Sequence, residues 1–460
     1  MVNTNDVDRG QWASRAGFIL AAAGSAIGLG NIWRFPYTAG ENGGGAFVMV
    51  YLIFVALIGT PVLLAELAVG RTTQRNSVGA FKALAPKTLW PWVGRLGVLT
   101  GFGILSFYSV IASFTLGYIY MAVTGRFADG IDNEQSRALF DTLSGHPAGS
   151  VLLLAAFMLL TALVVRRGIS SGIERAAKIL MPVFFVFLVV LAGRSLTLEG
   201  AGQGLRFLFA VDFSKITPAV AGIALGQALF SMSLGMGAMI TYGSYLPRKE
   251  NLPVAGLSVA FFDTLIALLA GVIIFPALFH AGASPDAGTG LVFVVMPTIF
   301  DAMPAGTLFA IGFYVLLAIA ALTSTMSLLE VIVAYFVDEH GWTREKTVWV
   351  VSGLCFLVAV PSALSYGAST YLSTMLSADP AAGFLDLMNI VFGNYALSIG
   401  ALFLCLFVGW RWKIAKAKAE IEGGGHRLPG GGLWGFLVRF VCPVAVVLIL
   451  AFIIITGEYF

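Results

Sequence analysis

Charged residues are scarce in this chain. Asp, Glu, Lys and Arg make up only 11% of its 460 residues, whereas a soluble domain averages roughly 25%. Hydrophobic residues make up 58%, and the mean hydropathy is +0.90. A soluble core cannot hide that much apolar surface, so the composition indicates a polytopic membrane protein. The roughly ten-residue alternating segments of a membrane barrel are missing, which favours an all-α bundle.

Cysteine and histidine are also rare. The three cysteines lie inside apolar runs and are expected to be small core residues, not disulfides or metal ligands: Cys355, Cys405 and Cys442. The histidines lie singly near the ends of segments: His146, His280, His340 and His426. This spacing predicts no metal cluster. Because no nucleophile–base pair is visible either, we do not expect an enzyme.

Long apolar segments are what the chain has in abundance. A membrane helix needs about 20 apolar residues, and we predict eleven such helices in a single domain, residues 1–460. The loop at residues 71–95 carries five basic residues and no acid, whereas residues 126–141 contain several acids. Basic loops stay in the cytoplasm. This predicts a cytoplasmic N-terminus and an extracytoplasmic C-terminus.

The stretch GSAIGLGNIWRFP at residues 24–36 interrupts the first apolar segment. Gly28 and Gly30 permit non-helical dihedrals, and Asn31 and Arg34 are unexpected in the middle of a membrane helix. Unwound backbone survives in lipid only where it is buried or lines a cavity, and broken helices mark binding sites in secondary transporters. The freed amides suit a carboxylate and the freed carbonyls suit a cation. The alternative is a close-packing notch.

A second interruption lies in the sixth segment, residues 226–245. Ser231 and Ser233 offer hydroxyls before the Gly-x-Gly at 235–237, and Met236 offers a flexible side chain that can reshape a pocket. Corresponding interruptions in two five-helix blocks predict an inverted repeat. The first repeat would span residues 9–197 and the second residues 213–413, with an eleventh helix at residues 433–456.

Three carboxylates lie within predicted helices. A carboxylate at membrane depth is costly and is a functional hypothesis by default. For Asp263 the expected partner is a cation or a proton. For Glu66 and Glu330 we expect a structural hydrogen bond to unwound backbone or a place on a cytoplasmic pathway. In the eighth helix, the hydroxyls of Thr323 and Ser324 with the Ala320 carbonyl would make an all-oxygen site for a monovalent cation such as sodium.

Residues 24–47, residues 226–245 and the motif LTSTMS at 322–327 together resemble the neurotransmitter:sodium symporter family, especially its bacterial amino-acid transporters. The resemblance covers residues 9–456. It implies a leucine-transporter-like fold with broken helices 1 and 6, in which two sodium ions lie beside the substrate. Many bacterial members similarly have eleven helices.

The resemblance also implies the binding residues. The first sodium site would be formed by Ala26, Asn31, Ser231 and Asp263 with the substrate carboxylate. The second would be formed by the carbonyls of Gly24, Ile27 and Ala320 and the hydroxyls of Thr323 and Ser324. The substrate carboxylate would meet Leu29, Gly30 and Tyr108, and its amino group would meet carbonyls near Ala26, Phe230 and Ser233. The side-chain pocket would be formed by Ser25, Ile104, Met236, Ser327 and Leu328.

Gates are implied on both sides of the pocket. Phe230 would close the pocket beneath Arg34, and Tyr245, Arg9 and Asp338 match a cytoplasmic gate. Asn389 occupies the position of the acidic partner of the outer arginine. The outer gate would therefore be weaker, bridged by water, or shifted to Asp386.

Three departures from the family pattern bear on the ions and the substrate. Gly28 stands where monoamine transporters carry Asp, which favours a substrate with its own carboxylate. Asp263 occupies a position at which many relatives have Asn, and Ala267 occupies a position at which chloride-dependent members have Ser. Tyr51, Gln227 and Ser231 match the remaining chloride contacts. Because a fixed carboxylate can replace the charge of the anion, we expect no chloride requirement. Protonation of Asp263 on the empty return step would add proton antiport.

The sequence therefore predicts sodium-coupled symport of a neutral, hydrophobic L-amino acid into the cell by alternating access, in a bacterial inner membrane. A small non-α zwitterion, such as a β- or γ-amino acid or taurine, is the alternative substrate. An amino-acid-sensing receptor and a channel are remote alternatives. We expect the lipid bilayer and the small substrate as partners, and no nucleic acid. A monomer would suffice, and a dimer is compatible with the sequence.

Overall fold

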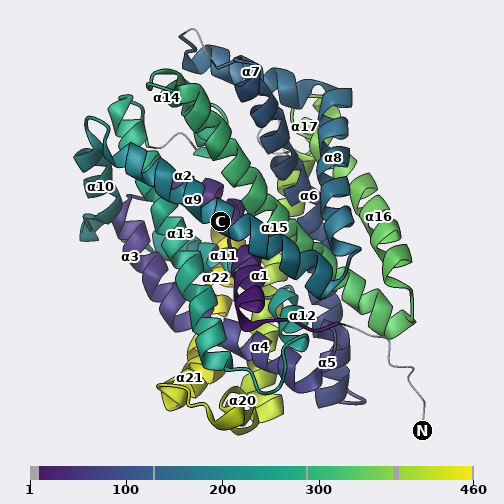
Figure 1. The fold of residues 1–460 in the computed structure, drawn as a ribbon. Coiled ribbons are helices and arrows are strands. Elements are labelled where there is room, and N and C mark those ends of the chain that lie inside the picture. The colour runs from purple at the N-terminus through teal and green to yellow at the C-terminus, as the bar shows by residue number, and fades with distance from the viewer. Residues whose placement is uncertain (1–9, 128–129, 286–287, 377–382, 458–460) are drawn as a thin grey trace.

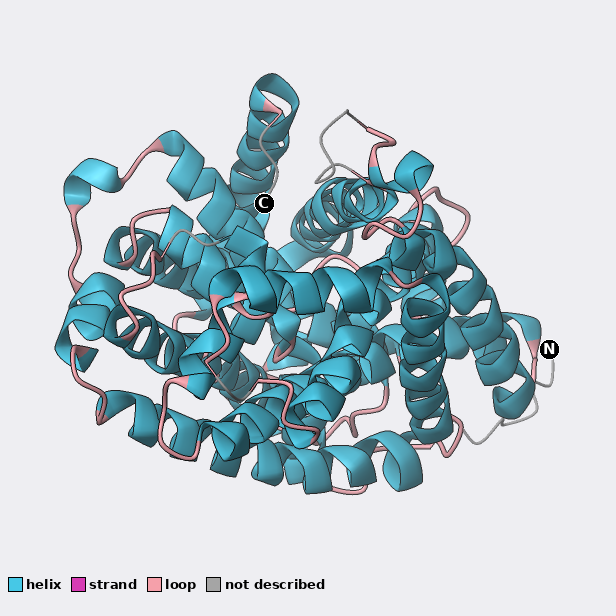
Figure 2. Cartoon of the chain, turned by 90° about the horizontal axis from the view of Figure 1, so that it is seen from above, coloured by secondary structure: helices cyan, strands magenta, loops and turns pink. Residues whose placement is uncertain are grey.

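A computed structural model describes residues 10–127, 130–285, 288–376 and 383–457. Every regular element in those ranges is a helix, and Figure 2 shows the helices connected by loops, with no strand among the described residues. The predicted all-α architecture is confirmed.

Nine helices within the described ranges are long and apolar enough to cross a membrane. They are Gly45–Thr73 (α3, Gly45–Phe54, and α4, Thr60–Thr73), Pro91–Val123 (α6), Pro147–Val165 (α8), Ile169–Leu196 (ending in α9, Arg175–Leu196), Leu252–His280 (α13), Gly306–His340 (α15), Arg344–Leu364 (α16), Phe384–Gly425 (α18, Phe384–Met388, α19, Leu397–Leu406, and α20, Ile414–Ile421) and Gly431–Thr456 (α21, Gly431–Phe436, and α22, Cys442–Thr456). Several contain π-helical segments: Val55–Gly59, Ile169–Glu174, Asn389–Ala396, Phe407–Lys413 and Leu437–Val441.

Two further membrane segments are broken. The first is α1 (Arg15–Ala26) followed by Gly30–Glu41, which contains the π-helical Gly30–Arg34 and α2 (Phe35–Glu41); its halves are bent by 49°. The second is α11 (Pro218–Ser231) followed by α12 (Ala238–Ser244). Because α11 has only 14 residues, it falls short of the about 20 that a span needs. Length and composition thus identify nine spans, or ten with the bent pair, and the predicted count of eleven is not confirmed.

Short helices connect the long ones. They are α5 (Ser77–Leu84), α7 (Asn133–Gly145), α10 (Ala201–Phe209), α14 (Val295–Asp301) and α17 (Thr370–Ser373), with 3-10 turns at Phe213–Lys215, Gly288–Leu291 and Gly423–Gly425. Local sequence explains where many helices begin. Ser14 caps α1 by accepting a hydrogen bond from the Gly17 amide, Asn251 caps α13 in the same way, and proline occupies the first turn of α6.

The broken helix α1 lies in the interior of the bundle, where it packs against α9, α12, α13 and α15 (Figure 1). The long helices α6 and α15 pack extensively against each other and complete this centre. Both breaks are therefore held away from lipid, as unwound backbone in a membrane requires.

Candidate functional site

The break in the first helix depends on Ile27. This residue is extended (φ −72°, ψ 105°), whereas Leu29 already has helical dihedrals (φ −58°, ψ −25°). Gly28 and Gly30 both lack a positive φ, so this break does not use the left-handed region that glycine favours. Gly28 is needed for space instead, because a Cβ at this position would collide with the hydroxyls of Tyr108 and Ser324.

The break in the sixth helix has a different backbone. Ser233, Gly235 and Gly237 have φ values of 55°, 81° and 76°, a left-handed region that glycine adopts without steric cost. Glu66 of α4 reaches this break, where its Oε1 accepts a hydrogen bond from the Gly235 amide at 2.7 Å. The carboxylate thus satisfies a buried backbone donor that has left the helix.

Side chains connect the two breaks directly. The Ser233 hydroxyl donates a hydrogen bond to the Ser25 carbonyl at 2.9 Å, and the Gln227 amide donates to the Gly30 carbonyl at 2.7 Å. Both acceptors lie beside the unwound stretch of the first helix. The two breaks therefore face each other across a few ångströms.

A small cavity lies at this meeting point, closed on its other sides by α6 and α15. It is lined by Ser25, Ala26, Gly28, Gly30, Ile104, Tyr108, Phe230, Ser231, Ser233, Met236, Ser324 and Leu328. Ser327, predicted for the pocket wall, does not line the cavity. Its hydroxyl lies against the Ser25 hydroxyl at 2.7 Å and the Ser324 carbonyl at 2.8 Å, so these partners hold it behind the wall.

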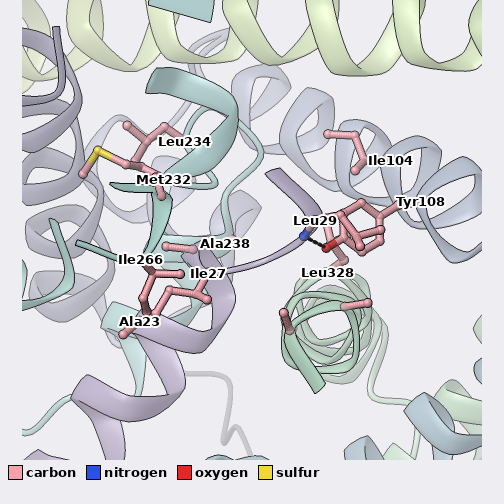
Figure 3. Packing of buried hydrophobic residues seen from close by; sticks show 14 of the residues in the cluster. Ala23, Ile27, Leu29, Ile104, Tyr108, Met232, Leu234, Ala238, Ile266 and Leu328 are labelled. Carbon is pink, nitrogen blue, oxygen red and sulfur yellow. Dashed lines mark hydrogen bonds between the residues drawn. The ribbon is translucent and has the colours of Figure 1, made fainter. Parts of the chain in front are cut away.

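The Tyr108 hydroxyl lies beside the first break. It accepts a hydrogen bond from the Leu29 amide at 2.8 Å, and Figure 3 shows this contact with Ile104 and Leu328 nearby. A carboxylate oxygen that displaces this contact can accept one hydrogen bond from the Leu29 amide and one from the Tyr108 hydroxyl.

Asp263 of α13 is fully buried and hydrogen-bonded to both broken helices. The Asn31 amide donates to its Oδ1 at 2.8 Å, and the Ser231 hydroxyl lies 2.8 Å from Oδ1 and 3.0 Å from Oδ2. The Tyr51 hydroxyl is 3.4 Å from Oδ2. The structure thus brings together the side chains predicted for the first sodium site. Ala26 lines the adjoining cavity.

A second group of oxygens lies where α15 crosses the first break. The Ser324 hydroxyl is 3.3 Å from the carbonyls of both Ser25 and Ile27. The Thr323 hydroxyl lies 2.9 Å from the Ala320 carbonyl, and a Cβ at Gly24 would lie 3.2 Å from Thr323 Cβ. The predicted second-site residues therefore lie together, and their oxygens are all uncharged.

On one side of the cavity, Arg34 lies over Phe230. The guanidinium carbon is 4.5 Å from the centre of the ring, a cation–π contact. Arg34 lines a second cavity together with both predicted partners, Asp386 and Asn389. Asp386 also accepts a hydrogen bond from the Gly383 amide at 2.9 Å.

On the opposite side, Tyr245 belongs to a buried charged cluster. Its hydroxyl donates to Glu330 Oε1 at 2.7 Å, and the Arg344 guanidinium forms an ion pair with the same carboxylate. Asp338 accepts hydrogen bonds from the backbone and side-chain amides of Asn76, each at 3.0 Å. Arg9, the other predicted gate residue, lies outside the described residues.

Comparison with known proteins identifies the family. The chain matches the model of the Sodium:neurotransmitter symporter family over residues 9–135 and 143–459. The chain belongs to this family. It is 40% identical over 442 residues to the uncharacterized sodium-dependent transporter YhdH of Bacillus subtilis, covering 95% of this chain and 96% of the relative. An uncharacterized sodium-dependent transporter of Haemophilus influenzae is 35% identical over 458 residues, covering 97% and 99%.

A solved structure supports the same family assignment and also identifies the fold. The crystal structure of MhsT in complex with L-phenylalanine matches this chain with a TM-score of 0.89 and 45% identity, covering 96% of this chain and 99% of MhsT. The protein therefore has the leucine-transporter-like fold that the sequence predicted. It is a multi-pass, sodium-dependent symporter of this family and not an enzyme.

Arg344 is the main site residue that the sequence analysis missed. Glu330 gave an indirect signal, because a carboxylate buried in a membrane helix needs a partner, and the next basic residue along the chain after His340 is Arg344. The link from Gln227 to the Gly30 carbonyl was also missed. Only the folded arrangement brings these residues together.

Proposed function

We propose that this protein couples sodium entry to the uptake of a neutral, hydrophobic L-amino acid. The observation that carries this proposal is the contact between the Leu29 amide and the Tyr108 hydroxyl, 2.8 Å apart, beside a cavity that Tyr108 lines and that two groups of oxygens flank. Donors for a carboxylate and oxygens for cations thus meet at the two helix breaks, as a site for both substrates requires.

The amino acid would lie with its carboxylate at Leu29, Gly30 and Tyr108. Its ammonium group would be directed toward carbonyl oxygens near Ala26, Phe230 and Ser233. The side chain would pack against Ile104, Met236 and Leu328, and the unbranched Met236 can adjust to different shapes. MhsT, whose structure contains L-phenylalanine, supports an aromatic or large aliphatic side chain.

The first sodium ion would bind at Asp263, Asn31 and Ser231 with the Ala26 carbonyl, next to the substrate carboxylate. The second would bind at Thr323 and Ser324 with the carbonyls of Gly24, Ile27 and Ala320. A formal charge at the first site and only neutral oxygens at the second suit a monovalent cation. Because the first ion and the carboxylate would touch, each would raise the affinity of the other.

Chloride would not be required. The Asp263 carboxylate accepts hydrogen bonds from Ser231 and Tyr51, two of the residues expected to contact chloride in chloride-dependent relatives. A fixed negative charge at this position would take the place of the charge of a bound chloride ion. Protonation of Asp263 during the return of the empty transporter would export a proton in each cycle.

Alternating access would use the gates on either side of the cavity. Phe230 beneath Arg34 would close the outer path, with Asp386 or Asn389 as the partner of the arginine. Tyr245, Glu330 and Arg344, with Asp338 and Arg9, would close the cytoplasmic path. The rearrangement would occur between two inverted repeats, residues 9–197 and 213–413, in a bacterial inner membrane with the N-terminus in the cytoplasm.

A small non-α zwitterion is the second candidate substrate. The cavity wall includes Ser25, Ser231 and Ser233, and these small polar side chains would suit a short molecule whose amino group lies further from its acidic group. The apolar residues Ile104, Leu328 and Met236 favour the hydrophobic amino acid instead.

The test is uptake of a radiolabelled panel into proteoliposomes. The panel contains L-phenylalanine, L-leucine, β-alanine, γ-aminobutyrate and taurine, each with sodium or choline outside and with chloride or gluconate. We expect concentrative, sodium-dependent uptake of the hydrophobic L-amino acids that does not change in gluconate. Sodium-dependent uptake of β-alanine, γ-aminobutyrate or taurine alone would overturn the substrate class, and a requirement for chloride would overturn the role given to Asp263.

A further inference from the structure

Two apolar grooves flank the first turns of α6. One is formed by the face of α6 at Val98, Leu99 and Phe102 with residues of α15 and α16, among them Phe336 and Leu354. The other is formed by Trp92, Val93 and Leu96 of α6 with Leu89, Trp90 and Phe403. Their volumes are about 400 and 480 Å³. Neither belongs to the transport site described above.

A single ridge of α6 separates the grooves. Trp92, Arg95, Leu96 and Leu99 are spaced three and four residues apart, so they lie along one face of the helix. Trp92 is 61% exposed and Leu99 is 54% exposed. Because Arg95 and Leu99 line the first groove while Trp92 and Leu96 line the second, the grooves lie on the two sides of this ridge.

A positively charged side chain, Arg95, lies at one end of the ridge. The Arg95 guanidinium lies 4.4 Å from the centre of the Trp92 ring, and in the described part of the chain it forms no ion pair. A second cation lies at the same end, because the Lys346 ammonium is 4.6 Å from the Trp342 ring and Trp342 lines the first groove. Among the residues that the structure describes, no acidic one lines either groove. From Arg95 to Phe102 the first groove extends about 10 Å along α6.

We propose that these two grooves form a binding site for one anionic phospholipid. Its two acyl chains would occupy the two grooves, and its phosphate would bind Arg95 on the ridge between them. Tryptophans are typical of the level of the headgroups. Trp92 lies against Arg95, Trp342 lines the same groove as Arg95, and Trp90 lines the other groove. The second cation, Lys346, favours a headgroup with a net negative charge over a zwitterionic one, whose ammonium it would repel.

The lipid site does not depend on which substrate the protein transports, so a negative result in one experiment leaves the other proposal standing. The prediction can be tested by native mass spectrometry of the purified, delipidated protein titrated with phosphatidylglycerol, lysophosphatidylglycerol, phosphatidylcholine or glycerol phosphate. We expect one tightly bound phosphatidylglycerol, weaker binding of the one-chain lipid and of phosphatidylcholine, and no binding of glycerol phosphate. Binding of glycerol phosphate as tight as that of the lipid would contradict a role for the grooves.

Matched variants test whether Arg95 binds the lipid phosphate. Arg95→Gln should weaken phosphatidylglycerol binding roughly fivefold, the effect of one cation near a lipid headgroup, and Arg95→Lys should retain most of it. Arg126→Gln removes the same charge near the other end of α6, about 45 Å away along the helix axis, and should leave binding unchanged. Equal affinities for Arg95→Gln and Arg126→Gln, or equal affinities of wild type for the one-chain and two-chain lipids, would overturn the proposal.

A groove-filling variant provides a second test. Val98 is buried in the first groove, and Val98→Phe would occupy space that an acyl chain needs. It should weaken binding of the two-chain lipid while leaving binding of the one-chain lipid within twofold. Unfolding of the variant, monitored by its melting temperature, is distinguishable from this selective effect. An unchanged affinity for both lipids in a folded Val98→Phe protein would contradict the site.

Discussion

The Asn31 side-chain amide lies 2.8 Å from the Asp263 carboxylate and thereby connects the broken first helix to α13. Both residues are fully buried. A buried carboxylate is stable only when it is hydrogen-bonded or paired with a cation, and Ser231 of the sixth helix completes its surroundings. The two broken helices and α13 therefore meet at one buried carboxyl group.

Replacing Asp263 tests this relationship. Asp263→Ala removes the only charged side chain of the proposed first sodium site, so the sodium concentration for half-maximal uptake should rise at least about tenfold. The measurement is a sodium titration of uptake in proteoliposomes. Asp212→Ala, which removes an exposed carboxylate bonded to Ser214, should have no effect. A normal sodium requirement in Asp263→Ala would show that the first site is assigned wrongly.

Removing the Tyr108 hydroxyl should affect the amino acid directly. Tyr108→Phe deletes one donor to the proposed substrate carboxylate, and a hydrogen bond to a charged group is worth about 1.5 to 3 kcal/mol. The apparent affinity for the substrate should fall by at least about tenfold. Tyr120→Phe, on the same helix but 66% exposed, is the matched control. Equal affinities in the two variants would argue against a carboxylate at Leu29.

A methyl group at Gly28 should abolish uptake. The Cβ of Gly28→Ala would collide with the hydroxyls of Tyr108 and Ser324, so either the break or the cavity wall must move. Gly193→Ala introduces the same methyl group where no atom lies within 4 Å and should transport normally. Uptake by Gly28→Ala within twofold of wild type would contradict the close approach seen here.

The buried cluster around Glu330 should stabilise the protein as a unit. Arg344→Gln leaves the Glu330 carboxylate without its cation and should destabilise the fold by about 3 kcal/mol. Arg344→Gln with Glu330→Gln should recover part of the lost melting temperature, since no buried charge then remains unpaired. The control is Arg166→Gln, an exposed arginine over Trp349. A double variant less stable than Arg344→Gln alone would contradict this account.

The sequence allowed the class, the helical fold and the two breaks to be predicted because each has a local signal. Apolar segments of the right length predict membrane helices, and Gly28, Asn31 and Arg34 in the middle of one predict a break. The backbone of that break could not be predicted. Ile27 adopts the extended conformation, and an isoleucine within an apolar segment gives no local signal for a helix break.

The site was predictable as a set of residues but not as a set of contacts. The family resemblance implied that Ser327 lies on the pocket wall, yet its hydroxyl bonds to Ser25 behind the wall. Arg344 was missed because its partnership with Glu330 depends on how α16 returns after α15. Both outcomes follow from tertiary packing, which helical periodicity alone does not determine.

The central claim is that sodium and the amino acid share one site. The most direct measurement is the dissociation constant of L-phenylalanine for the purified protein at low and at saturating sodium, together with the sodium affinity at low and at saturating L-phenylalanine. The account predicts that each ligand tightens the other by the same factor, at least about tenfold, with choline inactive and chloride irrelevant. An amino-acid affinity that does not change with sodium would contradict it.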